Sequence, residues 1–351
     1  MSSSPFDHPL LSGLLGDDVI APRFSAETEL EEMVRFEAAL ATAEGAEDVI
    51  PRVSAEFIAE RIGGFRADFG AVREATARDG TTGPEFVRQL RAFIGAPHDR
   101  YVHLGATSQD VVDTSLVLRL RPVIAEFKTR LEMVVTTLGQ LDRRFGAGGL
   151  MGRTRMQEAL PIRVADRIGG WRAPLQRDLD RLDELTPRLL VLQFGGAVGT
   201  LDQLGDKAFA VATRIAERLD LKLPGHSWHN QRDGIAEYAG WLSLVTGSLG
   251  KLGADVALMA QLGEIALRGG GTSSAMPHKQ NPVGAEVLVA LAHYSATLVG
   301  GMHVALVHEQ ERSGAAWTLE WLTLPQMVMA TAASLRTANT LLGQVVRIGQ
   351  E

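Results

Sequence analysis

The sequence predicts an all-α protein whose long helices pack side by side in a bundle. Between residues 113 and 145, apolar side chains recur at steps of three and four residues, which is the spacing of one helix face. A helix of about 33 residues spans roughly 50 Å. No run alternates apolar and polar residues for long enough to indicate a sheet. Several such rods with wide apolar stripes are typical of a long helix bundle.

The stretch 233–267 follows the same spacing more strictly. Gly247, Gly250 and Gly253 lie in this stretch, although glycine lowers helix stability. We therefore expect a neighbouring helix to approach closely there. The side chains assigned to its buried face are Ile235, Tyr238, Leu242, Val245, Leu249, Leu252, Val256 and Met259.

Shorter periodic segments fill the rest of the chain. Residues 1–112 carry the shorter segments and more turn signals, so we expect an N-terminal helical domain there and the central bundle domain over 113–351. Apolar stripes this wide also favour burial against other copies of the chain, which predicts an oligomer. Further helices are expected at 26–46, 54–76, 83–94, 158–185, 203–219, 283–311 and 318–346.

Composition excludes several classes of site. The 351 residues include no cysteine, which rules out disulfides, thiolate nucleophiles and cysteine-ligated zinc. The net charge is −7 and no dense Lys/Arg block alternates with aromatic residues, so a nucleic-acid partner is not expected. The N-terminal segment lacks the basic and apolar regions of a secretory signal. We expect a cytoplasmic protein.

One apolar stretch is long enough to cross a membrane. No Asp, Glu, Lys or Arg lies between Glu286 and Glu309. The stretch contains three histidines and two adjacent glycines, and it lacks flanking aromatic and basic anchors. We expect a buried helix of the bundle rather than a membrane span.

Three polar stretches lie between the predicted rods, where a bundle protein carries its chemistry. They read HLGATSQD (103–110), GRTRMQEALP (152–161) and GGGTSSAMPHKQNPVG (269–284). A linker explains the three glycines of the last stretch but not the Pro, His, Lys and Asn that follow. A catalytic loop with a glycine hinge explains both.

Taken singly, the first two stretches have simpler explanations. Thr107, Ser108 and Asp110 are residue types of a helix N-cap. Arg153 and Arg155 are compatible with solvated surface charges.

Two other motifs are weak. HSWH (226–229) places two histidines three residues apart, but no third ligand lies nearby in the sequence, so a metal site is not expected. GGAVG (195–199) is a glycine pattern with no strand before it.

Together, and in this order before long helices, the three polar stretches resemble the signature regions of the fumarase/aspartase superfamily. The third, SSAMPHKQNP, is the most specific. Within the superfamily, the chain is similar to the bacterial 3-carboxy-cis,cis-muconate cycloisomerases over nearly all of residues 20–340. The segments RYVHLGATSQDVVDT, WHNQRD and HEQERSGAAWTLEWLTLP are examples.

The resemblance implies an all-α homotetramer without cofactor or metal, in which loops of three subunits form each active site. It implies a small anionic di- or tricarboxylate as substrate. The reaction would close a substituted cis,cis-muconate to a muconolactone, in the protocatechuate branch of aromatic catabolism. The catalytic serine of the family falls on Ser273, and its substrate- and intermediate-binding pair on Lys279 and Asn281. The other matches are Thr107 and Ser108, which bind carboxylate, with His103 beside them, and Arg153, Thr154 and Gln157 of the second region.

A tri-anionic substrate that enters a chain of net charge −7 needs local cations. The candidates are Arg153, Arg155, Arg232, Lys279 and Arg312.

The chain departs from the family in two places. Arg155 stands where the superfamily's lyases carry histidine and where the cycloisomerases carry tryptophan. An arginine fork suits a carboxylate or a similar oxyanion, so we expect Arg155 to contact the 3-substituent of the muconate, a sulfonate included. The chain also stops soon after the last bundle helix, so we expect the family's small C-terminal helical domain to be missing.

Two alternatives remain at this point. A C–N lyase of adenylosuccinate, argininosuccinate or aspartate type, which releases fumarate, would carry the same stretches. The arginine in place of the histidine that protonates a leaving amine disfavours it. A non-catalytic structural bundle would keep the scaffold, but the intact Ser273, Lys279 and Asn281 argue against it.

Overall fold

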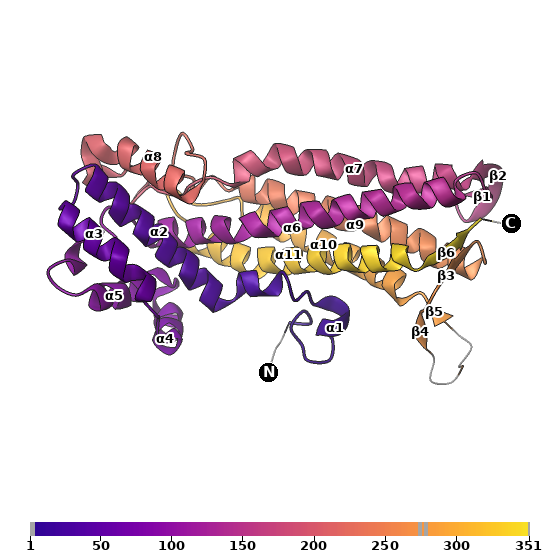
Figure 1. Ribbon diagram of the computed structural model, residues 1–351, viewed down its shortest axis with the longest axis horizontal. Helices are drawn as coiled ribbons and strands as arrows, with labels where there is room; N and C mark the ends of the chain where they lie inside the picture. The colour runs from indigo at the N-terminus through magenta and orange to yellow at the C-terminus, as the bar shows by residue number, and fades with distance from the viewer. Residues whose placement is uncertain (1–3, 273–275, 277–279, 350–351) are drawn as a thin grey trace.

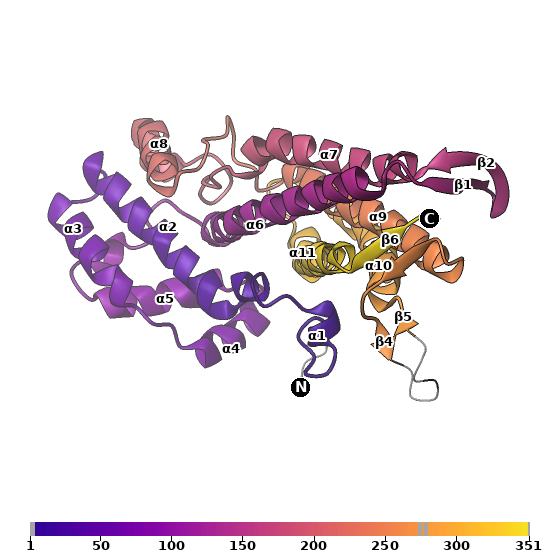
Figure 2. The same ribbon diagram turned by 45° about the vertical axis from the view of Figure 1, so that its right-hand side comes forward.

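Long helices lie side by side and form an elongated bundle (Figures 1 and 2). This computed structural model describes residues 4–272, 276 and 280–349. The longest helix, α6, has 38 residues and is therefore about 57 Å long. The expectation of a mostly helical bundle is confirmed. Its helices are α6 (Ser108–Phe145), α7 (Val164–Leu189), α9 (Asp233–Gln261), α10 (Val283–Val304) and α11 (Gly314–Gly343).

The apolar face predicted for α9 is the centre of the bundle. All eight side chains assigned to that face are at most 2% exposed. A Cβ atom on Gly253 would lie 2.6 Å from the carbonyl oxygen of Ala285 in α10, and one on Gly250 would overlap Ala292. These two glycines thus allow the close helix approach that the sequence predicts, whereas Gly247 has no neighbouring atom within 4 Å among the described residues.

Short helices form one end of the molecule (Figure 2). Here α2 packs against α3, α6 and α8. The short α1 (Ser12–Leu15) lies apart from this end, against α11 of the bundle (Figures 1 and 2). The elements of this end are η1 (Ala21–Phe24), α2 (Ala26–Ala46), α3 (Arg52–Arg61), η2 (Ile62–Gly64), α4 (Phe69–Asp79), α5 (Gly83–Ile94), η3 (Asp99–Tyr101), η4 (Asp202–Lys207) and α8 (Ala208–Leu219).

The part of the chain that the structure describes contains three short antiparallel strand pairs, which were not expected from the sequence. The sequence signal is weak because each pair has only two strands of two to seven residues and no continuous buried face. The pairs are β1 (Gly149–Thr154) with β2 (Gln157–Arg163), β3 (Ile265–Leu267) with β6 (Val345–Ile348), and β4 (Gly271–Thr272) with β5 (Gln280–Asn281).

Several predicted helix bounds change. The segment 54–76 divides into α3 and α4 around the turn η2, and the first residues of 158–185 form β2 rather than helix. Helix α6 starts at Ser108 and thus runs through residue 112. The division of the chain into domains at that position stays a prediction.

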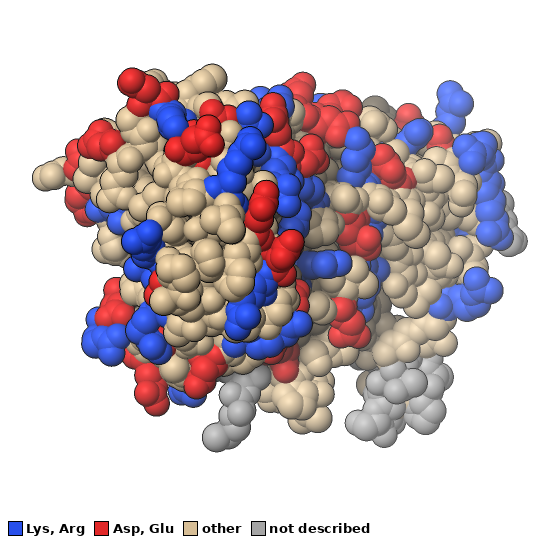
Figure 3. Space-filling view, turned by 60° about the vertical axis from the view of Figure 1, so that its left-hand side comes forward, with Lys and Arg blue, Asp and Glu red and all other residues tan. Residues whose placement is uncertain are grey.

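Two bundle helices, α9 and α10, are long and apolar enough to cross a membrane by length and composition alone. Half of the apolar window of α9 is buried inside the chain, but only 28% of that of α10. The expectation that α10 is a buried helix therefore holds only in part within one chain. On the face shown in Figure 3, basic and acidic side chains are interspersed.

Candidate active site

The first polar stretch forms the turn that leads into α6. His103 and Gly105 have left-handed backbone conformations, with φ of 62° and 69°. Thr107 is the N-cap of α6 and Ser108 its first residue, so the predicted helix cap is confirmed. The N-terminus of a helix presents unpaired N–H groups and the positive end of its dipole, and it therefore favours an anion. Carboxylate binding by Thr107 and Ser108 remains compatible with the cap.

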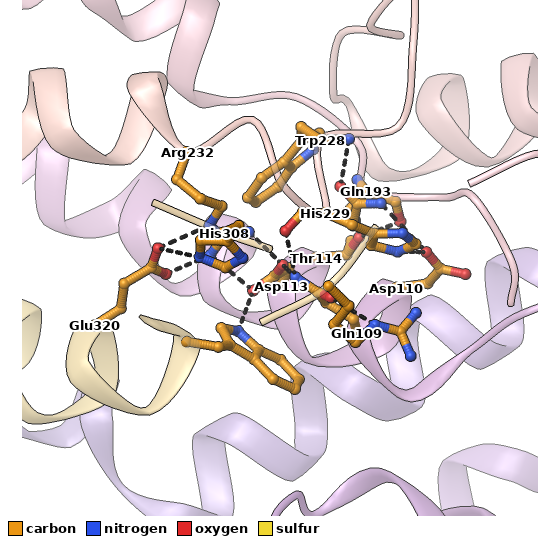
Figure 4. A network of polar contacts seen from close by, with 12 residues as sticks. Gln109, Asp110, Asp113, Thr114, Gln193, Trp228, His229, Arg232, His308 and Glu320 are labelled. Atoms are coloured by element: carbon orange, nitrogen blue, oxygen red, sulfur yellow. Dashed lines mark hydrogen bonds and ion pairs between the residues drawn. The ribbon is translucent and has the colours of Figure 1, made fainter. Parts of the chain in front are cut away.

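The buried carboxylate of Asp110 connects this turn to two other segments (Figure 4). The group is fully buried and accepts hydrogen bonds from five donors. They are the backbone N–H groups of Thr107 (3.0 Å), Gly195 (2.9 Å) and Gly196 (2.9 Å), Nε2 of His229 (2.7 Å) and Nε2 of Gln193 (3.3 Å). A carboxylate with this many donors holds the three segments in one arrangement.

The glycine pattern GGAVG is required by this arrangement. A Cβ on Gly195 would lie 2.5 Å from Oγ of Ser227, and one on Gly196 would lie 2.8 Å from the carbonyl oxygen of Gly105. Gly196 also has a φ of 68°, a conformation that favours glycine. The pattern thus allows the backbone to reach Asp110, a role with no signal in the sequence.

His229 of HSWH also belongs to this arrangement rather than to a metal site. Its ring is buried and bonded to Asp110. Across residues 4–272, 276 and 280–349, no group of three or more His, Asp or Glu residues is arranged to hold a metal ion. The expected absence of a metal and of a cofactor stays a prediction.

The expectation that Arg232 belongs to a basic substrate pocket is wrong. Its side chain is 1% exposed, and it pairs with Asp113 (2.6 Å) and Glu320 (2.5 Å) (Figure 4). Trp317 and Gln109 also donate hydrogen bonds to Asp113 (3.0 and 3.1 Å). Burial by itself lowers the pKa of the Arg232 guanidinium, but the two carboxylates outweigh burial and raise that pKa. The partners lie more than 80 positions away in sequence, so spacing alone does not reveal them.

Arg312 is the predicted cation that lies beside the first stretch. Its Nε donates to Oε1 of Gln109 (2.9 Å), in the first turn of α6, and its Nη2 donates to the carbonyl oxygen of Ala197 (3.3 Å). The residue is exposed. Arg312 therefore adds a positive charge to the N-terminal end of α6.

Glu37 is a further residue at this end that the sequence did not single out. It projects from α2, and its Oε1 lies 2.5 Å from Nδ1 of His103. The pair joins residues 66 positions apart.

The second polar stretch forms the hairpin β1–β2 at the opposite end of α6 (Figures 1 and 2). Arg153 lies in β1. Its Nη1 forms an ion pair with Oε1 of Glu264, and its Nη2 lies 3.1 Å from Oε1 of Glu158. Its charge is therefore already paired within the chain. Thr154 and Gln157 face each other across the turn and are exposed.

Arg155 and Met156 occupy the two positions of that turn. Their φ angles are 50° and 66°, which are uncommon for residues with a side chain. Two-residue hairpin turns of this kind favour Asn and Gly. Both side chains are exposed, so Arg155 is presented at the tip of the hairpin.

The third polar stretch contains the paired strands β4 and β5. Gly271 pairs with Asn281, which lies just before α10, and a Cβ on Gly271 would lie 2.5 Å from Cγ2 of Val283. Ser273 and Lys279 lie outside the described residues. Their roles and the glycine hinge stay predictions.

A cavity of about 260 Å³ adjoins this third stretch. Gly270, Asn281 and Arg336 are among its lining residues. Arg336 is a cation that the sequence did not single out, because its position within α11, two turns before the end of the helix, has the spacing of an ordinary helix residue.

Among the residues that the structure describes, the first stretch lies apart from the second and from Asn281 of the third. The first stretch and the second lie at opposite ends of α6, about 57 Å apart. Asn281 lies at the start of α10, whereas Arg312 follows the other end of that helix. The described part of one chain therefore places Arg312 against Gln109, directly after Ser108 at the start of α6. It leaves Arg153, Thr154, Arg155, Gln157 and Asn281 apart from this end of α6.

Known proteins resemble this chain over most of its length. The lyase family matches residues 19–294. The 3-carboxy-cis,cis-muconate cycloisomerase of Pseudomonas aeruginosa is 43% identical over 91% of this chain and 71% of its own length. That of Pseudomonas putida is 41% identical over 91% and 77%. The crystal structure of the 3-carboxy-cis,cis-muconate lactonizing enzyme from Pseudomonas putida superimposes with a TM-score of 0.90, at 40% identity, over 96% of this chain and 76% of that one.

Proposed function

Because the chain belongs to the lyase family of the fumarase/aspartase superfamily, we propose that it is a cycloisomerase that closes 3-carboxy-cis,cis-muconate to the corresponding muconolactone. The observation that carries the proposal is the 43% identity to a cycloisomerase of that name over 91% of the chain. The three signature stretches are present in order. The natural role would be in aromatic catabolism, in the cytoplasm.

The reaction needs a fixed substrate shape and fixed donors. A carboxylate oxygen bonds to an alkene carbon, and the cis diene brings it within reach of a five-membered ring. Holding that conformer recovers entropy, worth roughly several kcal/mol. Negative charge builds on the carboxylate conjugated with the attacked alkene, and one proton is taken up at the carbon next to it. Three carboxylates thus become two and a lactone.

The residues at the N-terminal end of α6 suit this charge. Thr107 and Ser108 lie at the positive end of a 38-residue helix, and Arg312 lies beside them. Asp110 holds the turn in place through its own buried hydrogen bonds. Preorganised donors of this kind stabilise a developing anion because they need no rearrangement during the reaction.

Ser273 is our candidate for the general acid that protonates the carbon, with Lys279 and Asn281 as donors to the anionic intermediate. A serine hydroxyl is a weak acid in water. It becomes effective where water is excluded and where N–H groups and an ammonium stabilise its alkoxide.

We propose a homotetramer with active sites shared between three subunits. The separation of the stretches within one chain supports this, since a site that needs all of them requires other copies. Exposed apolar side chains on the bundle, among them Leu244, Leu258, Val304 and Leu322, also favour association. The sparse burial of α10 agrees with that.

The assay that tests the function follows the loss of the muconate diene absorbance with 3-carboxy-cis,cis-muconate, and identifies the product by NMR. We expect diene loss and a muconolactone. Formation of fumarate from adenylosuccinate, argininosuccinate or aspartate without diene loss would favour a C–N lyase instead. Absence of both activities in the assembled protein would favour a structural bundle.

Arg155 is proposed to contact the 3-substituent of the muconate. In Arg155→Trp, we expect turnover of 3-sulfomuconate to fall about tenfold or more relative to that of 3-carboxymuconate, since the planar donor fork is lost. The ratio of kcat/KM for the two substrates measures this. An unchanged ratio would contradict a role of Arg155 in substrate choice.

A further inference from the structure

A buried acid–base pair lies behind the first polar stretch. The Glu37 side chain is 2% exposed and that of His103 is 11% exposed. Oε1 of Glu37 lies 2.5 Å from Nδ1 of His103. A carboxylate at Nδ1 sets the orientation of an imidazole ring and leaves Nε2 as its other polar atom.

The backbone at His103 is held in an uncommon conformation, with φ of 62°. Arg91 of α5 donates two hydrogen bonds to the carbonyl oxygen of Val102 (3.0 and 3.3 Å), and the Gly105 N–H donates to Gln203 (3.2 Å). Such conformations persist where surrounding contacts enforce them, and they occur often at functional sites. The position of the ring is therefore fixed from both the backbone and the side chain.

The charged groups around His103 favour its protonated form. Glu37 faces it from α2, Asp110 from α6 and Arg91 from α5. Burial lowers the pKa of the His103 imidazole, and Arg91 acts in the same direction. The charge and hydrogen bond of Glu37, with a smaller effect of Asp110, outweigh both and raise that pKa above its usual value. His103 thus stays positively charged to a higher pH than an ordinary histidine.

The pair lies at the end of α6 where an anion is favoured. His103 precedes the N-cap Thr107 by four positions, in a turn that Asp110 ties to α6. Because Glu37 binds Nδ1, the negative charge lies on one side of the ring. The pair as a whole is neutral but directs its positive end away from Glu37.

We infer that Glu37 is a positioning residue, which holds His103 as an imidazolium whose Nε2–H donates to a carboxylate of the substrate. The inference rests on the proposed function, because it requires an anionic substrate at this end of α6. It adds Glu37 to the residues that determine substrate affinity, although Glu37 does not touch the substrate.

Glu44 provides a matched control on the same helix. It lies seven residues after Glu37, is 0% exposed, and neither carboxylate oxygen has a hydrogen-bond partner among the described residues. Burial, with a smaller effect of Glu37, raises its pKa to about 9. Glu44 is therefore uncharged at neutral pH, and Glu44→Gln leaves the charge around His103 unchanged there.

The first measurement is an NMR titration of the His103 imidazole in the assembled protein. His103→Asn identifies the signal, since asparagine tolerates a positive φ. We expect a pKa above about 6.5 in the wild type and a pKa lower by about one unit or more in Glu37→Gln. Glu44→Gln should titrate like the wild type. A wild-type value at or below the usual histidine pKa, or no shift in Glu37→Gln, would overturn the inference.

The second measurement is the pH dependence of KM and kcat in the diene-loss assay. In the wild type, KM should rise as pH increases through the raised pKa of His103, because the imidazolium is lost. In Glu37→Gln, the rise should begin at lower pH, with KM about 10-fold higher at about pH 7.5 and kcat much less changed. Glu44→Gln should follow the wild type. A purely structural role of Glu37 would not move this pH profile.

A double variant separates the two residues. His103→Asn should raise KM by a similar factor and remove the pH effect, and adding Glu37→Gln should cause no further rise. If Glu37→Gln shifts the titration but leaves KM unchanged, His103 does not bind the substrate carboxylate and the inference is wrong. If Glu37→Gln does not fold, the pKa of His103 in the wild type and the KM of His103→Asn still test the inference. If the wild type lacks diene-loss activity, the proposed function fails, while the titration reports separately on Glu37.

Discussion

At the scale of single residues, Asp110 receives five hydrogen bonds from three segments that the chain brings together at the start of α6. Its neighbour Asp113, one helix turn later, pairs with Arg232 in a second buried arrangement. Both carboxylates lie in the first turns of α6, where the sequence pattern is that of an ordinary helix N-terminus. Their different roles come from the partners that face them.

We predict that Asp110→Asn lowers the free energy of unfolding by about 3 kcal/mol. The amide replaces one acceptor oxygen by a donor, which then opposes backbone N–H groups in a buried site. Urea unfolding followed by circular dichroism measures the change. The control is Asp183→Asn, which removes an exposed ion pair with Lys128 and should cost less than about 1 kcal/mol. Equal effects of the two variants would contradict the role of Asp110.

The burial of Glu44 predicts that the stability of the protein depends on pH. Its pKa is raised to about 9 by burial and, to a smaller extent, by Glu37. An acid with a raised pKa in the folded state costs nothing below its unfolded pKa, and stability is lost as pH rises from there towards the folded pKa. Between the ordinary glutamate pKa of 4.5 and pH 7, the loss is on the order of 3 kcal/mol.

Glu44→Gln should therefore gain stability relative to the wild type as pH rises from 4.5 to about 7. Urea unfolding at several pH values within this window tests it. The two proteins should differ least at the acidic end. Parallel stability curves would mean that Glu44 ionises normally in the folded protein.

At the scale of elements, the contact between α9 and α10 depends on glycine. A Cβ on Gly253 would lie 2.6 Å from the Ala285 carbonyl oxygen and 2.9 Å from Leu288 Cβ, whereas none of the described atoms lies within 4 Å of one on Gly247. We predict that Gly253→Ala destabilises the protein by about 1–3 kcal/mol through overpacking. Gly247→Ala in the same helix should instead stabilise it by up to about 1 kcal/mol. Thermal unfolding compares the two, and a destabilisation of equal size in both would contradict this packing.

Hydrophobic periodicity predicts the long helices of this protein but not its short strands. The regular spacing in α9 and α6 predicts long helices because their faces bury continuously against neighbours. The hairpin β1–β2 has few buried side chains and a turn of Arg155 and Met156, which are not typical turn residues. Its strand structure comes from backbone pairing at the end of the bundle, and the local sequence does not encode that pairing clearly.

At the scale of the whole molecule, the signature stretches lie at different ends of one chain. If active sites are shared, variants inactivated in different stretches should complement each other. We predict that Ser273→Ala and His103→Asn, assayed at a substrate concentration well below KM, where the raised KM of His103→Asn lowers its rate, recover activity above either variant alone when they are unfolded and refolded together. The diene-loss assay measures the recovery. Each variant refolded by itself is the control, and a mixture no more active than the variants would contradict shared sites.

Part of the candidate site could be named from the sequence. His103, Thr107 and Ser108 lie at the N-terminal end of α6, where Arg312 bonds to Gln109, and the two peptide segments that carry these residues have recognisable patterns. Glu37, Gln193 and Arg336 could not be found in that way, because each lies in an ordinary stretch. Arg232 was assigned wrongly for a different reason, because the carboxylates that bury and pair its charge come from distant helices.

The sequence by itself determined the helical class, the long rods, the family and the order of the three polar stretches, because these depend on local spacing and on short motifs. Only the tertiary structure decided which charges are available. It buried Arg232 between Asp113 and Glu320, paired Arg153 with Glu264, and set Glu37 against His103. The physical reason is that burial and pairing of a charged group depend on residues distant in sequence, which meet only when the helices pack.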